Sequence, residues 1–265
     1  MPGQRPPGRL IPVALRPVAG VIIAVCVAIL AALAGLVYHG SQPTGLDSAV
    51  ARVLVPSSGP GGFHGGPGSP RLAFELAAIG QVGGPIPITF LTCVLVYCCI
   101  AMRRFRGAVL TAAAVIIASS LTEFVLKPLI HRTFTGFLSF PSGHTTAAFA
   151  LAGSIVVLLA GPPDTRLPVS LRAVLAALTL GAGALVAIGL VVGRQHYFTD
   201  TIGGAAVGIG VALSAALVID KVAERRGRAA QLIAPEPATA QQGAAGRGLL
   251  VCSNSWLGNG ALPWP

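Results

Sequence analysis

The pentapeptide Phe140-Pro141-Ser142-Gly143-His144 separates two long apolar stretches of the chain. Proline fits poorly inside a helix and serine is a favoured N-cap, so we expect a new helix to begin here. The first N–H groups of such a helix have no partner within it and form a site for an anion. Gly143 permits close approach, and His144 can hold or release a proton near neutral pH. Taken alone, the pentapeptide fits an ordinary capped loop with one interfacial histidine equally well.

The composition of the whole chain is that of a membrane protein. Hydrophobic residues make up 54% of its 265 residues and charged residues only 10%, whereas a soluble domain carries about a quarter charged residues. The net charge of +10 does not indicate nucleic-acid binding, because the arginines stand in short groups beside apolar runs. Arginines in such places are typical of topology signals and of contacts with anionic lipid.

The five cysteines predict neither a metal site nor a disulfide framework. Four lie inside apolar segments and one lies near the C-terminus, at positions 26, 93, 98, 99 and 252. We therefore expect small core residues in the apolar segments. The sequence also shows no carboxylate cluster of the kind that holds a divalent metal, so we expect no metal and no other cofactor.

Hydropathy divides the chain into six apolar spans, which predict an all-α, polytopic bundle of six transmembrane helices. The spans cover about residues 17–38, 85–102, 107–126, 144–160, 173–192 and 199–219. The first span exceeds the core of a cleaved signal peptide, ~7–15 residues, so we expect it to be retained. Small residues at 31–34 leave cleavage as the alternative.

The predicted domain organisation follows from these spans. We expect five parts: a basic cytoplasmic segment (1–16), the first transmembrane helix (17–38), a flexible extracytoplasmic loop rich in Gly, Pro and Ser (39–70), a membrane core (71–221) and a disordered cytoplasmic tail (222–265). Within the core, residues 71–82 are predicted to form a short amphipathic helix at the membrane interface.

The arginine-rich segments predict the orientation in a cell (plasma) membrane. They are the N-terminus, the turn after residue 102, the link at 161–172 with Arg166 and Arg172, and the segment after residue 219. The positive-inside rule places all four, and therefore both termini, in the cytoplasm. The remaining intervals then bring six basic or imidazole side chains to the extracytoplasmic surface: Lys127, His131, Arg132, His144, Arg194 and His196.

His196 and Asp200 are spaced one helical turn apart. A carboxylate beside an imidazole fixes its tautomer and stabilises its cation, as a nucleophilic or general-base histidine requires. The plain alternative is that Asp200 caps the last helix and His196 lies at headgroup level. Lys127 and Arg132 suit a phosphate but also suit snorkelling at a span end, and Glu123 is spaced to pair with Lys127.

Together these segments resemble the type 2 phosphatidic acid phosphatase superfamily, which also includes vanadium haloperoxidases. The resemblance covers about residues 71–221 and rests on Lys127 with Arg132, on the run 141–144 and on His196-Tyr197-Phe198-Thr199-Asp200. It implies that His196 attacks phosphorus to form a phosphohistidine, that Asp200 orients it, and that His144 protonates the leaving oxygen and then activates water. It also implies a set of groups that hold the phosphoryl oxygens: Lys127, Arg132, Ser142 and the Gly143 N–H.

The chain departs from the family pattern at two positions. An arginine seven residues after the lysine is replaced by Phe134, and one six residues before the second histidine is replaced by Leu190. Arg132 falls where many members carry an additional arginine. Arg194 lies one turn after Leu190, and we hypothesise that its long side chain reaches the vacated space and binds phosphate.

The sequence therefore predicts a hydrolase: an integral membrane phosphatase that acts on a lipid phosphate or isoprenoid diphosphate at the extracytoplasmic face, without a metal. Its partners would be that substrate and membrane lipids. The alternative is a catalytically impaired relative that binds lipid headgroups or a partner protein, which the two missing arginines favour. A transporter or channel is a third class, disfavoured because the spans hold few polar residues and show no clear inverted repeat.

Overall fold

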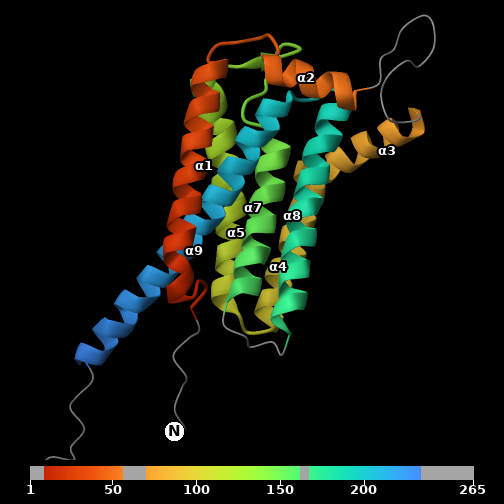
Figure 1. The fold of residues 1–265 in the computed structure, drawn as a ribbon. Helices are drawn as coiled ribbons and strands as arrows, with labels where there is room; N and C mark the ends of the chain where they lie inside the picture. The colour runs from red at the N-terminus through yellow and green to blue at the C-terminus, as the bar shows by residue number, and fades with distance from the viewer. Residues whose placement is uncertain (1–8, 56–69, 162–166, 234–265) are drawn as a thin grey trace, which may run out of the picture. The chain divides into compact units, whose positions relative to one another are not determined.

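The structure is a computed structural model that describes residues 9–55, 70–161 and 167–233 (Figure 1). The chain divides into two compact units, Met1–Ala223 and Glu224–Pro265. The described residues are mostly helical, with these α-helices in chain order: α1 (Arg16–Val37), α2 (Gly45–Leu54), α3 (Pro70–Gly80), α4 (Pro85–Ala101), α5 (Phe105–Leu121), α6 (Lys127–Ile130), α7 (Gly143–Ala160), α8 (Val169–Val192) and α9 (Phe198–Ile233).

Short elements connect these helices. The 3-10 turns η1 (Val13–Leu15) and η2 (Gln81–Gly83) precede α1 and α4, and a π-helical turn, η3 (Thr122–Leu126), joins α5 to α6. Strands β1 (Thr133–Phe134) and β2 (Phe137–Leu138) form a small antiparallel hairpin that leads to α7, with Thr133 opposite Leu138. This hairpin places a partly apolar flap beside the start of α7.

Five helices of the described residues are long and apolar enough to cross a membrane, or six if a bent pair counts as one span. The five are Val13–Val37, Phe105–Ile130, Gly143–Ala160, Val169–Val192 and Phe198–Ala229, and the pair is Arg71–Gly83 with Pro85–Ala101, bent by 57°. Pro85 begins α4 and has no N–H with which to continue the preceding helix. The predicted all-α, multi-pass fold is confirmed in this coarse form.

Two of the arginine-rich segments, the turn after residue 102 and the end of the link at 161–172, meet at the end of the bundle where α7 finishes. Arg104 donates to the carbonyl oxygen of Leu158, and Arg172 donates to that of Gly161. Both histidine motifs lie at the other end, where α7 and α9 begin. This arrangement agrees with the predicted topology, in which the arginine-rich segments and the histidine motifs lie at opposite ends of the spans. Which end faces the cytoplasm stays a prediction, and Arg166 lies outside the described residues.

The segment predicted as a flexible loop at 39–70 contains a helix, α2. The Thr44 hydroxyl accepts from the Asp47 N–H, and the Asp47 carboxylate accepts from the Thr44 N–H, which completes a capping box. Such reciprocal caps stabilise the first turn of a helix. The expectation of an unstructured loop was therefore wrong for α2, while residues 56–69, which include the glycine-rich runs, lie outside the described residues.

The described residues next to both termini are ordered, although the tail from residue 222 is predicted to be disordered. Leu10 and Ile11 are buried, and their N–H groups donate to the Asp220 carboxylate at 2.9 and 3.0 Å. α9 continues to Ile233 and so includes the first twelve residues of the predicted disordered tail, 222–233. Residues 1–8 and 234–265 lie outside the described residues.

α7 is the most buried of the candidate spans, and α9 packs closely against it. A Cβ atom at Gly204 would lie 2.6 Å from the carbonyl oxygen of Ser142, and one at Gly208 would lie 2.5 Å from that of Thr146. Small residues allow such close approach between membrane helices. The packing brings the start of α7 beside the first turns of α9, and these two places carry the predicted histidines.

Candidate active site

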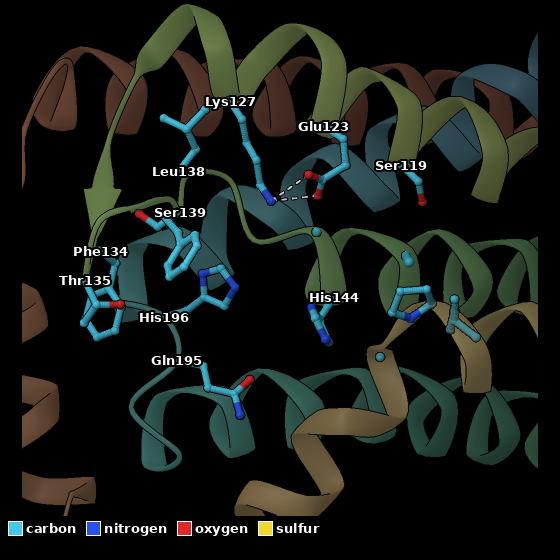
Figure 2. Close-up of a pocket in the computed structure, with 16 residues that line it drawn as sticks. Ser119, Glu123, Lys127, Phe134, Thr135, Leu138, Ser139, His144, Gln195 and His196 are labelled. Carbon is cyan, nitrogen blue, oxygen red and sulfur yellow. Dashed lines mark hydrogen bonds and ion pairs between the residues drawn. The ribbon is translucent and has the colours of Figure 1, made fainter.

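A cavity of about 540 Å³ lies where α6 ends and α7 and α9 begin (Figure 2). Its walls include apolar side chains of α4, α7 and the β hairpin, and its polar lining comprises Ser119, Glu123, Lys127, Thr135, Ser139, His144, Gln195 and His196. The rings of His144 and His196 have centroids 6.4 Å apart. The two histidine motifs, which lie far apart in the chain, therefore converge on one cavity.

His196 lies beside Asp200, as their spacing predicts. Nδ1 of His196 is 3.6 Å from Oδ2 of Asp200, which is longer than a hydrogen bond. This nitrogen is buried and has no hydrogen-bond partner among the described residues. A proton on Nδ1 would point to a carboxylate that lies close by, and it would leave the lone pair of Nε2 free to bind a ligand.

Lys127 reaches the cavity as one half of an ion pair. Its Nζ donates to both carboxylate oxygens of Glu123, at 2.7 and 2.8 Å, which confirms the predicted pairing. The carboxylate also lies against Gly143, where an added Cβ would collide with Oε1 of Glu123. A negative charge therefore stands at the start of α7, where the sequence predicts a bound anion.

Ser142 caps α7, as predicted, but does not line the cavity. Its Oγ accepts from the Thr145 N–H at 3.4 Å, and its own N–H donates to the carbonyl oxygen of Asp200 at 3.0 Å. The side chain is fully buried. The structure thus places Ser142 as the link between the first turns of α7 and α9, and its neighbour Gly143 lines the cavity.

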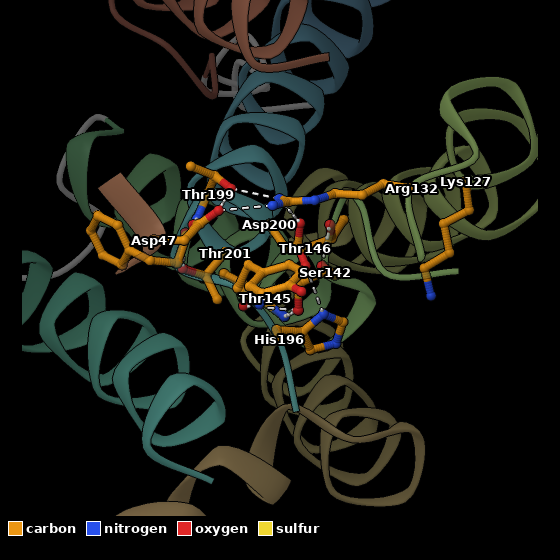
Figure 3. A network of polar contacts seen from close by, with 12 residues as sticks. Asp47, Lys127, Arg132, Ser142, Thr145, Thr146, His196, Thr199, Asp200 and Thr201 are labelled. Carbon is orange, nitrogen blue, oxygen red and sulfur yellow. Dashed lines mark hydrogen bonds and ion pairs between the residues drawn. The ribbon is translucent and has the colours of Figure 1, made fainter. Parts of the chain in front are cut away.

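Arg132 does not line the cavity either, although the sequence analysis expects it to bind phosphate (Figure 3). Its side chain is fully buried. Nη1 donates to Asp200 Oδ1 and to Thr199 Oγ1, both at 2.6 Å, and Nη2 donates to Asp47 Oδ2 at 2.8 Å. Its Cζ lies 4.3 Å from the ring centroid of Tyr197. Arg132 therefore binds two carboxylates behind the histidine, which corrects the expected role.

Asp47, on α2, is the member of this network that the sequence analysis missed. It is buried, and its Oδ1 accepts from the Thr199 N–H at 2.8 Å. Burial by itself raises the pKa of this carboxyl. The hydrogen bonds from Thr199, Arg132 and Thr44 together outweigh burial, so the pKa of Asp47 lies below its ordinary value. The Thr44–Asp47 capping pattern was the local signal for this helix, but nothing in the sequence pairs Asp47 with Arg132.

Arg194 lines a neighbouring cavity of about 400 Å³, together with Arg52 and Tyr197. His196 and Phe134 line both cavities. Leu190, like Phe134, stands where the family pattern has an arginine, and it is fully buried. Within the described residues, Lys127 is thus the only Lys or Arg that lines the cavity shared by the two histidines.

Comparison with protein families confirms the resemblance drawn from the motifs. The sequence model of the PAP2 superfamily matches residues 119–224, a range that contains Lys127, both histidines and Asp200. Neither the comparison with curated proteins nor the comparison with solved structures finds a match.

Proposed function

Because residues 119–224 match the sequence model of the PAP2 superfamily, which includes phosphatases, we propose that this protein is an integral membrane lipid phosphatase. The observation that carries the proposal is the convergence of the His144 and His196 rings, 6.4 Å apart, on a cavity that Lys127 also lines. This cavity suits a single tetrahedral anion held between a nucleophile, His196, and a proton donor, His144.

The proposed substrate is a lipid phosphate or an isoprenoid diphosphate. The cavity lies at the ends of candidate membrane spans, and its walls include Ile88, Phe134 and Leu138. A phosphate at headgroup depth would reach the histidines while its apolar chain stays among the helices. By the positive-inside rule this end of the bundle faces away from the cytoplasm.

In the first step, Nε2 of His196 attacks phosphorus opposite the leaving oxygen. The N–P bond forms as the P–O bond to the lipid breaks, and His144 donates its proton to the departing oxygen. The lipid alcohol, or the lipid monophosphate when the substrate is a diphosphate, leaves. Asp200 stabilises the positive charge that develops on the His196 ring.

In the second step, His144 takes a proton from a water molecule, whose oxygen attacks the phosphohistidine. The P–O bond to water forms, the N–P bond breaks, and inorganic phosphate is released. Lys127 and the first N–H groups of α7 stabilise the charge on the equatorial oxygens in both steps. Phosphoryl transfer depends chiefly on such placement and charge.

The test is phosphate release by the purified full-length protein in lipid nanodiscs. The substrates are phosphatidic acid, phosphatidylglycerol phosphate, an isoprenyl diphosphate and a prenyl-phosphosugar, each with and without a chelator. Wild type should release phosphate from at least one of them, and His196→Ala should abolish release. Activity that persists in chelator would support the predicted metal-free chemistry.

A histidine that does not line the cavity provides the matched control. His131 stacks on His39 outside the cavity and has φ = 54°, a conformation that asparagine tolerates. His131→Asn should therefore keep wild-type activity. No release from any substrate by folded wild type, or release unchanged in His196→Ala, would refute the proposal.

The alternative function is a catalytically impaired relative that binds lipid headgroups. One observation favours it: Lys127, the cation that lines the cavity in the described residues, is paired with Glu123. Binding of a lipid phosphate without turnover, in wild type and His144→Ala alike, would favour this alternative over the enzyme.

A further inference from the structure

The π-helical turn η3 places an acidic side chain inside the proposed phosphate site. Within η3, the Lys127 N–H donates to the carbonyl oxygen of Thr122, five residues back, and Glu123 lies in the same turn. Such turns within α-helices are frequent at functional sites. Glu123 has no part in the proposed catalytic steps.

The Glu123 carboxylate contacts the same groups that are proposed to bind the phosphoryl oxygens. Both of its oxygens accept from Lys127 Nζ, and Oε1 lies against Gly143, the first residue of α7 (Figure 2). A carboxylate and a phosphate bind to the same groups, namely an ammonium group and the N–H groups at the start of a helix. The side chain therefore stands where the mechanism needs an empty anion site.

The placement of Glu123 changes the charge that an incoming phosphate meets in the cavity. Lys127 and Glu123 cancel each other, and among the described lining residues the remaining titratable side chains are His144 and His196. An incoming phosphate therefore meets no net positive charge from the Lys–Glu pair. It would also approach a like charge at contact distance, a repulsion that grows with the charge of the phosphate.

The Glu123 side chain has room to leave. It is 44% exposed, whereas the Lys127 side chain is 14% exposed. Movement of the carboxylate toward the mouth of the cavity would free the ammonium group and the start of α7 together.

We propose that Glu123 is a built-in competitor of the substrate. Its carboxylate holds the phosphate site until an anion displaces it, and it disfavours a dianionic phosphate more than a singly charged one. This inference rests on the proposed function, because it concerns the same site. It makes Glu123 a specificity-determining residue for the charge of the phosphate group.

The test measures anion binding directly, with inorganic orthovanadate and inorganic phosphate as probes and isothermal titration calorimetry as the readout. Glu123→Gln keeps the size of the side chain and removes its charge. We expect this change to tighten the binding of both anions about tenfold where the anion is singly charged, the order of effect for one like charge removed at contact distance in a partly exposed site, and by more at a pH where the anion is doubly charged. In turnover assays, KM for the lipid phosphate should fall more than kcat changes.

The chain offers a matched control in Glu75, which forms the same i,i+4 ion pair with Arg71 at 2.9 Å on α3 and does not line the cavity. Glu75→Gln should leave the affinity for both anions unchanged. Glu123→Ala provides a second variant if the glutamine hydrogen-bonds Lys127 and keeps it occupied. Gel filtration of all three variants checks that each is folded.

The outcomes separate this inference from the proposed function. Anion binding that is unchanged or weaker in both Glu123 variants would overturn it, and weaker binding would mean that Glu123 positions Lys127. If wild type hydrolyses lipid phosphates and neither variant binds anions more tightly, the inference alone fails. If no lipid phosphate is hydrolysed but the variants bind vanadate more tightly, the inference stands and the proposed function fails.

Discussion

Two polar clusters share one end of the bundle and differ in burial and pairing. In the buried network, Arg132, Asp47 and Asp200 are at most 1% exposed at their side chains, and the guanidinium binds both carboxylates. In the cavity, His196 is 12% exposed, and its Nδ1 has no hydrogen bond among the described residues. In the first cluster the guanidinium binds both carboxylates within the fold, although Nε of Arg132 has no hydrogen-bond partner among the described residues. The second cluster lines a cavity and retains groups that can act on a ligand.

The two clusters meet at Asp200. One oxygen of its carboxylate accepts from Arg132, and the other lies 3.6 Å from the His196 ring. A single guanidinium against two carboxylates leaves one negative charge in the network. In the proposed mechanism, that charge stabilises the positive charge that develops on the His196 ring during attack. The buried cluster therefore holds the carboxylate beside His196, while its own members do not line the cavity that the two histidines share.

The largest expected effect on stability follows from removing the buried cation. Arg132→Met leaves Asp47 and Asp200 buried without their shared partner, a loss of about 3–5 kcal/mol in the free energy of unfolding. Chemical denaturation in detergent measures it. A shift no larger than that of the exposed-pair variant Arg71→Met would contradict the assignment of Arg132 to a structural network.

In the cavity, loss of a cation should affect stability little and activity strongly. Lys127→Met breaks a partly exposed pair and should change stability by no more than about 1 kcal/mol. Phosphate release should nevertheless fall about 10²-fold, because an oxyanion-stabilising donor is lost. Steady-state kinetics and denaturation of the same sample test both halves. Comparable turnover in Lys127→Met and wild type would remove Lys127 from the site.

The contribution of Asp47 to the stability of the buried network should depend on pH. Because the pKa of its carboxyl is lower in the folded state than its ordinary value of 3.8, its stabilising contribution is fully present above that pH. The contribution is lost as the pH falls through the lower, folded-state pKa. Wild type should therefore exceed Asp47→Asn in stability near neutral pH, and the difference should shrink below pH 3.8. A gap that stays constant across this range would show that the charge of Asp47 is not the cause.

The smallest effect is expected at the neighbouring cavity. Arg194→Ala removes a side chain that lines the second cavity together with Arg52 and His196. If Arg194 substitutes for a missing family arginine, phosphate release should fall severalfold with little change in stability. Arg52→Ala is the control from the same cavity. Equal activity in Arg194→Ala and wild type would end the substitution hypothesis.

Much of the candidate site was predictable because its signals are local. The helix start at residue 143 follows from a proline and a capping serine, and the Glu123–Lys127 pair follows from four-residue spacing. Hydropathy and arginine placement then bring His144 and His196 to one end of the bundle. The same reasoning failed for Arg132, since its charge suited a phosphate as well as a carboxylate.

The sequence by itself determined the apolar spans, the caps and the i,i+4 pairs, since these depend on the transfer of whole segments out of water and on neighbours within one helical turn. Only the tertiary structure decided that Asp47 meets Arg132, 85 residues away, and that Glu123 rests against Gly143. A buried charge needs a partner, but its own sequence neighbourhood does not say which. The packing of α2 at the end of the bundle where α7 and α9 begin made that choice, and Arg132, a predicted phosphate ligand, instead binds the carboxylate beside His196.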